Sequence, residues 1–301
     1  MYSSRALVDT TCVLVWTHVR GLQGLLRPLG LDLSPVQGAP RDEHPVWIDL
    51  GYVKSGAGEA LEVDQHVWWR RTGEAAGSAL SWAYGAWTAA ALRASTEALG
   101  GVAEQFSRSV SRTLGTYEEI LIAVPNVIAS RGGDRPYAFV LGMYTNSPIA
   151  VWGDGALRYG YKKRFCRVQS QLFQSYAVRD SEGTTLLSAN IAISESQSWR
   201  PARSVTGLAE PLRLISQPLL GDLGQGRFAL SLLERDYLDQ RHTLVIPSQV
   251  ALKAAPELVA GLPGAEYATA PLGSQAPWGA FSFANVTTRV TYPYHLSLAD
   301  L

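Results

Sequence analysis

Hydrophobic and polar residues alternate with a period of two near the middle of the chain. Between residues 117 and 124, one set of alternate positions holds Tyr117, Glu119, Leu121 and Ala123, and the other set holds Glu118, Ile120, Ile122 and Val124. Side chains of a β-strand point alternately to its two faces. The pattern therefore predicts a strand here, with Glu118 and Glu119 on opposite faces.

Similar runs along the chain predict a protein built mostly of strands. Apolar segments rich in β-forming residues, bounded by Gly, Pro and polar clusters, lie at residues 12–17, 44–52, 137–144, 186–193, 228–233, 243–246 and 286–292. Because strands and helices do not alternate regularly, we expect an α+β fold, mainly an antiparallel β-barrel or cone with peripheral helices.

Two helices outside the central region are predicted from other patterns. Leucines spaced by three or four residues follow Val19 and stop at Pro28 and Gly30, which predicts a short amphipathic helix. Residues 248–262 are also predicted to be helical. We expect residues 1–301 to form a single domain.

We expect residues 53–116 to form a partly helical insertion in this domain. Ser78 is a suitable N-cap for a long helix whose apolar stripe includes Leu92, Leu99 and Phe106. The insertion is interpreted as a helical hairpin packed on the barrel or on a partner subunit, or as a lid over a pocket.

Charge and composition exclude several classes of function. Lys plus Arg equals Asp plus Glu at 26 each, so no net field favours nucleic acid or an anionic membrane surface. No apolar run is long enough to span a bilayer and the first residues lack a signal-peptide pattern, so we expect a cytoplasmic protein. Neither the histidines nor Cys12 and Cys166 have metal-site spacing, and no nucleotide-binding loop is present, so no metal or cofactor is expected.

Lys162 and Lys163 are the most distinctive candidates for chemistry. They follow Tyr159, Gly160 and Tyr161 at the end of an aromatic run of low charge. Burying two neighbouring ammonium groups is costly, so one of them is expected to lose its proton. A neutral lysine amine is a nucleophile toward ketones, and acetoacetate decarboxylase is the standard example of this activation.

Three pieces of the sequence, in order, resemble the acetoacetate decarboxylase family across residues 117–165. They are the Tyr117-Glu118-Glu119 start of a strand closed by Pro125, the pair Met143-Tyr144, and the lysine pair. The resemblance implies that Lys162 forms a Schiff base with a ketone, that Lys163 keeps Lys162 neutral, and that Glu119 is an active-site acid or base.

The resemblance also suggests substrate-binding residues. The strand that includes Asp49 resembles the one that carries a second glutamate in the family; Glu104 is a rival for this second carboxylate. Tyr144 and Tyr161 flank the motif, and Tyr161 replaces the usual proline. Where the family has Gly-Arg-Glu, this chain has the sequence Gly-Asp-Gly-Ala at 153–156.

The family's arginine is therefore missing, and either Arg158 or Arg164 is expected to hold a substrate carboxylate instead. The resemblance implies a cofactor-free lyase that acts on a small oxo acid and assembles as a homo-oligomer. Decarboxylation of a 3-oxo acid is one expected reaction. The alternatives are an aldolase-dehydratase or cyclase of specialised metabolism, and a non-catalytic ligand-binding or scaffold protein.

Overall fold

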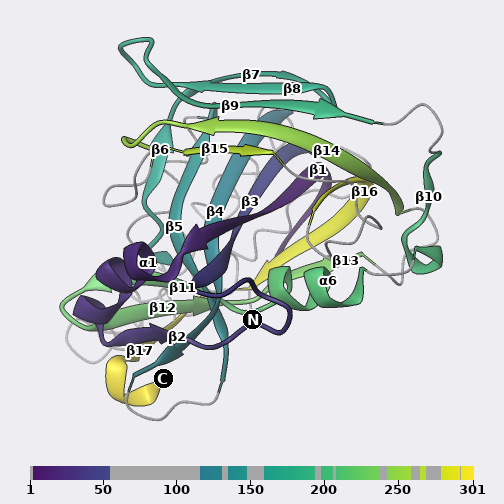
Figure 1. Cartoon of the computed structure of the whole chain (residues 1–301). Coiled ribbons are helices and arrows are strands. Elements are labelled where there is room, and N and C mark those ends of the chain that lie inside the picture. The colour runs from purple at the N-terminus through teal and green to yellow at the C-terminus, as the bar shows by residue number, and fades with distance from the viewer. Residues whose placement is uncertain are drawn as a thin grey trace, which may run out of the picture.

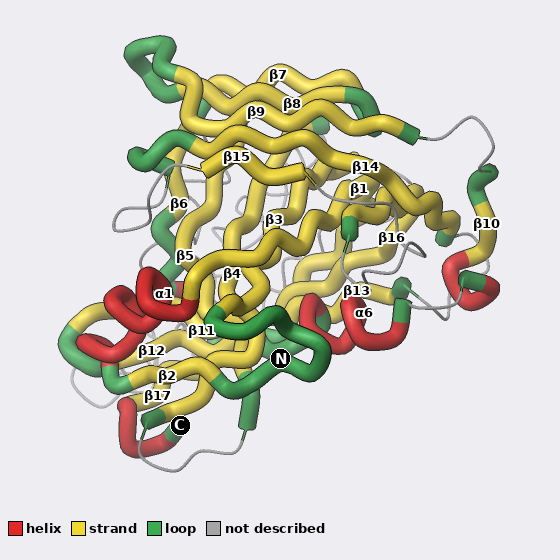
Figure 2. The backbone as a smooth tube through the Cα atoms, in the orientation of Figure 1, coloured by secondary structure: helices red, strands yellow, loops and turns green. Residues whose placement is uncertain are grey.

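One large mixed sheet with few helices dominates the computed structural model (Figure 1). The structure describes residues 3–54, 116–130, 135–147, 159–193, 198–205, 208–237, 243–258, 265–268, 279–291 and 293–301. The tube in Figure 2 shows how little helix accompanies the strands. The expected α+β, sheet-rich class is confirmed.

Long antiparallel strands make up the central part of the sheet. Strand β1 (Ser3–His18) pairs with β3 (Glu43–Lys54), β3 with β4 (Tyr117–Ala129), and β4 with β5 (Tyr137–Thr145). On the other edge, β1 pairs with β16 (Ala280–Thr291). The short strand β6 (Lys163–Phe165) runs parallel to β5. The strands predicted at residues 12–17, 44–52, 117–124 and 137–144 are present in this region, and the one predicted at 286–292 is present as far as residue 291.

A second group of strands runs across the top of the view in Figure 1. It contains β7 (Arg167–Gln171), β8 (Ser175–Arg179), β9 (Thr185–Ala192), β14 (Leu244–Ala254) and β15 (Ala265–Ala268). Strand β14 pairs with both β9 and β16, and so joins this group to the central strands.

The remaining strands complete the sheet. They are β2 (Leu31–Leu33), β10 (Arg200–Pro201), β11 (Leu219–Gly224), β12 (Arg227–Ser231), β13 (Leu233–Asp236) and β17 (Tyr294–Ser297). Strand β11 runs parallel to β5, while β13 pairs with β16 and β12 with β17. No pairing between the described strands closes the sheet, which corrects the expectation of a closed barrel.

The helices are short. Helix α1 (Val19–Leu26) buries Leu22 and Leu26, continues into the 3-10 turn η1 (Arg27–Leu29), and ends at Gly30 with φ of 77°, as predicted. Helix α6 (Ala209–Ile215) and the turns η3 (Ala202–Ser204) and η4 (Leu298–Asp300) were not predicted.

The helix predicted for residues 248–262 is wrong over its described residues, 248–258, which form the end of β14 and a turn. Residues up to Ala254 belong to β14, where Val250 and Leu252 are buried between exposed Gln249, Ala251 and Lys253. This period of two is that of a strand with one buried face. Of the expected insertion, residues 55–115 lie outside the described residues, and Glu104 with them.

The two faces of strands β3, β4 and β5 are covered by different groups of residues. We call them the Glu119 face and the Glu118 face, after the neighbouring glutamates that point to them. The Glu119 face includes Trp47, Leu121 and Met143, and packs against side chains of β13 and β16 and helix α6. The Glu118 face includes Ile48, Ile120 and Tyr144, and packs against side chains of β8, β9 and β14.

Candidate active site

Sheet register aligns one row of residues across five strands. Cys12 is opposite Asp49, Asp49 opposite Leu121, Leu121 opposite Met143, and Met143 opposite Lys163. Residues directly opposite each other in neighbouring strands point to the same face. Lys163 therefore belongs to the Glu119 face, although it comes from a strand that is only three residues long.

Lys163 and Glu119 form an ion pair on this face. The Nζ atom of Lys163 lies 2.5 Å from Oε2 of Glu119, and the side chains are 11% and 23% exposed. Glu119 is opposite Thr145, and Lys163 is opposite Met143, so the ion pair reaches across β5. Lys162, the predicted Schiff-base residue, is exposed. The structure thus brings Glu119 together with Lys163.

Backbone packing holds the approach to β6 in place. Gly160 has φ of 64°, and a Cβ atom on Gly221 would lie 1.9 Å from the carbonyl oxygen of Tyr159. Such a close approach to β11 requires glycine. The buried Tyr161 hydroxyl hydrogen-bonds to Oγ of Ser231 on β12, and its ring lies 5.5 Å from that of Tyr159. Tyr161 thus anchors the residues just before Lys163.

Asp49 forms a second ion pair on the Glu119 face, with Arg235 of β13. Its side chain is 2% exposed and that of Arg235 is 8% exposed. Thr10 donates a hydrogen bond to Oδ1 of Asp49, and the Sγ of Cys12 lies 3.5 Å from the same oxygen. Nη1 of Arg235 donates to the Tyr237 hydroxyl at 3.0 Å.

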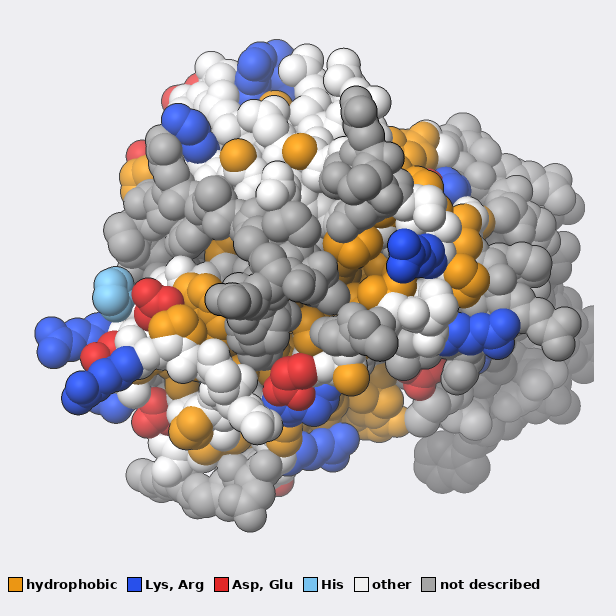
Figure 3. All heavy atoms as spheres, turned by 45° about the vertical axis from the view of Figure 1, so that its right-hand side comes forward, with side chains coloured by type: hydrophobic (Ala, Val, Ile, Leu, Met, Phe, Trp, Pro, Cys, Tyr) orange, Lys and Arg blue, Asp and Glu red, His pale blue; other side chains and the backbone are white. Residues whose placement is uncertain are grey.

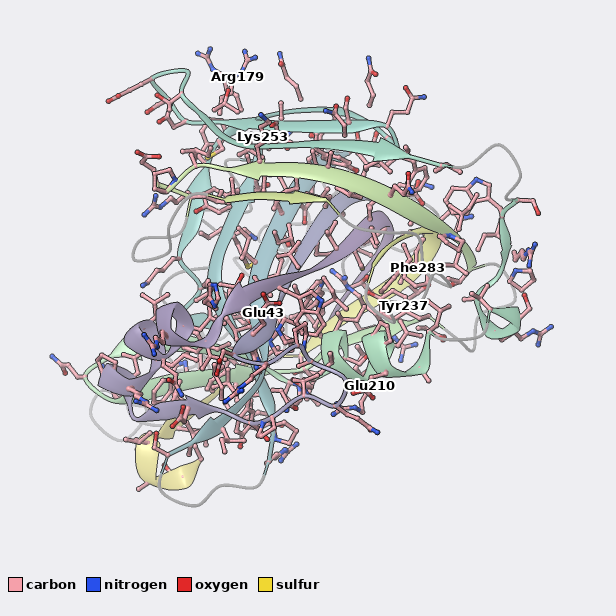
Figure 4. The ribbon with its side chains drawn as sticks, in the orientation of Figure 1. Glu43, Arg179, Glu210, Tyr237, Lys253 and Phe283 are labelled. Atoms are coloured by element: carbon pink, nitrogen blue, oxygen red, sulfur yellow. The ribbon has the colours of Figure 1, made fainter. Side chains whose placement is uncertain are left out.

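Aromatic rings enclose this second pair. The Cζ atom of Arg235 lies 5.5 Å from the ring centroid of Trp47, a cation–π contact. The rings of Tyr237 and Phe283, which Figure 4 shows close together, have centroids 4.5 Å apart. Such a wall of rings keeps water from the guanidinium.

Burial and charge set the protonation of this group. Burial is the largest influence on Arg235 and opposes its charge, but the Asp49 carboxylate, Tyr237 and Cys12 together outweigh it, so the pKa of Arg235 is raised well above its ordinary value. Burial, then the charge of Asp49, raises the pKa of the Cys12 thiol well above its ordinary value. The Cys12 sulfur is therefore a protonated neighbour of Asp49, not a thiolate nucleophile.

The two ion pairs lie on adjacent strands. Asp49 is opposite Leu121, and Glu119 is opposite Gly51, so the two carboxylates are diagonal neighbours on β3 and β4. Such neighbours have Cα atoms about 7 to 8 Å apart. A lysine amine and a guanidinium are thus held side by side on one face, each by its own carboxylate.

Two predicted substrate-binding residues lie on the opposite face. Tyr144 is buried on the Glu118 face, where its hydroxyl donates to the carbonyl oxygen of Leu258. Arg164 is opposite Tyr144 and is exposed. Burial raises the pKa of Tyr144 to about 12, and Arg164 lowers it in part, so the two groups are neighbours. Arg158 lies outside the described residues.

Arg235 and Tyr237 were not identified from the sequence. The only local signal is the alternation of Leu233, Arg235 and Tyr237 with Glu234 and Asp236, which places an arginine on an otherwise apolar face. The contact between β13 and β3 joins segments that are far apart in the sequence, so no local sequence pattern predicts it.

The described residues contain no group of three or more His, Cys, Asp or Glu arranged to hold a metal ion. No helix among them is both long and apolar enough to cross a membrane. On the surface visible in Figure 3, both basic and acidic side chains are present.

Comparison with solved structures identifies the fold. Two structures of the enduracididine biosynthesis enzyme MppR match with a TM-score of 0.51 and 12% identity over 98% of this chain. The structure with bound HEPES buffer is covered over 88% of its length. The other, covered over 90%, is a complex with the condensation product of pyruvate and imidazole 4-carboxaldehyde.

This chain shares the fold of MppR. At 12% identity this match shows the fold alone, so the family resemblance at residues 117–165 stays a prediction. No protein-family model matches the sequence, and no curated protein matches it significantly.

Proposed function

We propose that this protein is an enzyme of specialised metabolism that binds a small oxo acid and forms an imine with it through Lys163. The observation that carries the proposal is the ion pair of Lys163 with Glu119 on the Glu119 face. A lysine that is both shielded from water and in contact with a carboxylate has a proton acceptor in place for the first step.

The proposed reaction begins with a proton transfer. Glu119 accepts a proton from the Lys163 ammonium, and the neutral amine attacks the carbonyl carbon of the substrate to form a carbinolamine. Glu119 then returns the proton to the hydroxyl group, which leaves as water while the iminium forms. The iminium accepts the electron pair of a bond that breaks at the neighbouring carbon.

The geometry favours Lys163 over Lys162 as the amine. Lys162 is exposed, whereas Lys163 is 11% exposed and reaches the carboxylate. No carboxylate contact of Lys162 is found among the described residues. Lys162 then serves as the neighbouring cation, which reverses the roles implied by the sequence resemblance.

Two reactions of the iminium are consistent with this site. The MppR complex contains a condensation product of pyruvate and an aldehyde, which supports aldol condensation followed by dehydration for the present chain. Loss of CO2 from a 3-oxo acid uses the same iminium. We place condensation first, because the Gly-Asp-Gly-Ala sequence at 153–156 lacks the arginine and glutamate associated with decarboxylation in the resembling family.

The proposal is tested by borohydride reduction of the protein in the presence of pyruvate or acetoacetate, followed by intact-mass analysis. The expected result is a stable adduct with at least one of these acids, and none without borohydride. Product analysis then distinguishes CO2 release from condensation with an added aldehyde. A folded protein that forms no adduct with either acid would refute imine chemistry and leave a ligand-binding role.

A further inference from the structure

Three buried polar atoms near Arg235 have no hydrogen-bond partner within the described part of the chain. They are Nε of Arg235, Nε1 of Trp47 and Oγ1 of Thr288. Thr288 is directly opposite Arg235 in the pairing of β13 with β16, so both point to the same face. Trp47 lies against the guanidinium, with its ring centroid 5.5 Å from Cζ. All three atoms thus belong to one neighbourhood on the Glu119 face.

The chemistry of these atoms specifies their missing partner. An indole N–H and a guanidinium N–H only donate, and a threonine hydroxyl can donate as well. Buried donors are rarely left without an acceptor in folded proteins. The nearest carboxylate, Asp49, is already engaged: Oδ2 binds Arg235, and Oδ1 accepts from Thr10 and lies near Cys12. The group is therefore suited to a further oxygen acceptor from outside the chain.

We propose that Arg235, Trp47 and Thr288 form a binding site for the carboxylate of an oxo acid. The inference rests on the proposed function, and it specifies which end of the substrate lies at Lys163 and which end lies at Arg235. The guanidinium is held by Asp49 and the reactive amine by Glu119, and these carboxylates are diagonal neighbours. One small molecule thus places its carbonyl carbon at Lys163 and its carboxylate at Arg235.

This site gives the enzyme its preference for acids over neutral ketones. Hydrogen bonds from a guanidinium to a carboxylate are charge-assisted, and the enclosing rings of Trp47, Tyr237 and Phe283 strengthen them by excluding water. Arg164, which the sequence suggested for this role, lies on the opposite face.

The test compares pyruvate with its uncharged methyl ester as substrates for borohydride trapping. The variants Trp47→Phe and Thr288→Val each remove one polar atom and keep a similar shape. We expect each to raise the pyruvate concentration that gives half-maximal trapping by about tenfold, the loss expected for one hydrogen bond to a charged group. Trapping of the ester is expected to change little. Thr287→Val, on the same strand but the opposite face, is the matched control.

Equal changes for pyruvate and its ester, or no change for either, would overturn the carboxylate site. Arg235→Lys is a third variant, but it leaves Asp49 with a poorer partner and can fail to fold; the other two variants keep the test decisive.

A second measurement separates this inference from the imine mechanism. Lactate has the carboxylate of pyruvate but no carbonyl, so its binding to Lys163→Ala is independent of imine formation. Titration calorimetry is expected to detect lactate binding that Trp47→Phe weakens about tenfold. If wild type forms no adduct but this binding is seen, the imine mechanism fails and the carboxylate site stands. If Lys163→Ala binds lactate equally with and without Trp47→Phe, or does not bind it, the carboxylate site is refuted.

Discussion

The two faces of strands β3, β4 and β5 come from the same stretches of sequence, yet they differ in chemistry. On the Glu118 face, two polar side chains form hydrogen bonds with uncharged groups: Glu118 accepts from Ser170 and Asn146, and the Tyr144 hydroxyl donates to a backbone carbonyl. On the Glu119 face, two cations from other strands meet carboxylates of β3 and β4. Because successive residues of a strand point to opposite faces, two side chains one position apart lie in different environments.

This difference indicates that stability and chemistry are divided between the faces. The Glu118 face is an apolar core in which side chains of β8, β9 and β14 pack on the central strands. The Glu119 face holds ionised groups at a substantial desolvation cost. Such a cost is typical of functional sites, where charged groups are kept in a fixed arrangement.

The largest expected difference between the faces is in the rate of imine formation. Glu119→Gln removes the proton acceptor of Lys163, so the rate with an oxo acid should fall about 10²- to 10⁴-fold, as for loss of general acid–base catalysis. Glu118→Gln, one residue away on the opposite face, is the control and should leave the rate unchanged. Stopped-flow measurement of imine absorbance gives both rates. Equal rates in the two variants would contradict the assignment of the faces.

A large loss of stability is expected from breaking the buried ion pair. Asp49→Asn leaves Arg235 without a carboxylate, which should lower the free energy of unfolding by about 3 to 5 kcal/mol. Glu210→Gln breaks the more exposed pair with Arg213 and should cost no more than about 1 kcal/mol. Urea denaturation measures both values. A loss from Asp49→Asn as small as that from Glu210→Gln would show that Arg235 does not depend on this carboxylate.

A smaller effect is expected from the Glu118 face. Tyr144→Phe removes the hydroxyl that donates to the carbonyl oxygen of Leu258, and should lower the free energy of unfolding by about 1 kcal/mol. Imine formation should be unaffected. Tyr161→Phe, which removes the contact with Ser231 next to Lys163, should alter both quantities. Slower imine formation in Tyr144→Phe would argue against the separation of the faces.

The smallest effect concerns pH and His44, which lies on the Glu118 face of β3. Burial lowers the pKa of His44, against a weaker opposing effect of its 2.7 Å hydrogen bond to the carbonyl oxygen of Pro125. The unfolded chain therefore binds a proton more readily than the folded one. Stability from the neutral ring is fully present above about pH 6.5 and is lost as the pH falls toward the folded pKa, by up to about 1.4 kcal/mol per pH unit.

Urea denaturation between about pH 7.5 and 5.5 should show this loss in the wild type and a smaller one in His44→Gln. His295→Gln, at an exposed position, is the control and should retain the wild-type slope. Identical slopes in all three proteins would refute the assignment.

Much of the fold follows from local patterns in the sequence. The alternation at residues 117–124 predicted both strand β4 and the opposite orientation of its two glutamates, and Pro28 with Gly30 predicted the end of the first helical segment. The error at residues 248–254 arose because the strand alternation of buried Val250 and Leu252 with exposed Gln249, Ala251 and Lys253 was read as a helix. The closure of the sheet depends on pairings between distant strands, which local patterns do not encode.

The candidate site was only partly predictable. The lysine pair was predicted from its residue types, and Glu119 and Asp49 from the family resemblance. Only register decides which lysine faces Glu119, because neighbouring residues point in opposite directions. Arg235 is distant from Asp49 in the sequence, and Arg164 was the more obvious choice beside the lysines. Only the tertiary structure shows that Arg235 lies on the Glu119 face and Arg164 on the opposite face.

The measurement that tests the central claim most directly is borohydride trapping with an oxo acid in two variants, Lys162→Ala and Lys163→Ala, followed by peptide mass mapping. The account predicts that Lys162→Ala retains the adduct on Lys163, and that Lys163→Ala loses it while remaining folded. An adduct that persists on Lys162 in Lys163→Ala and disappears in Lys162→Ala would contradict the account and restore the roles implied by the sequence resemblance.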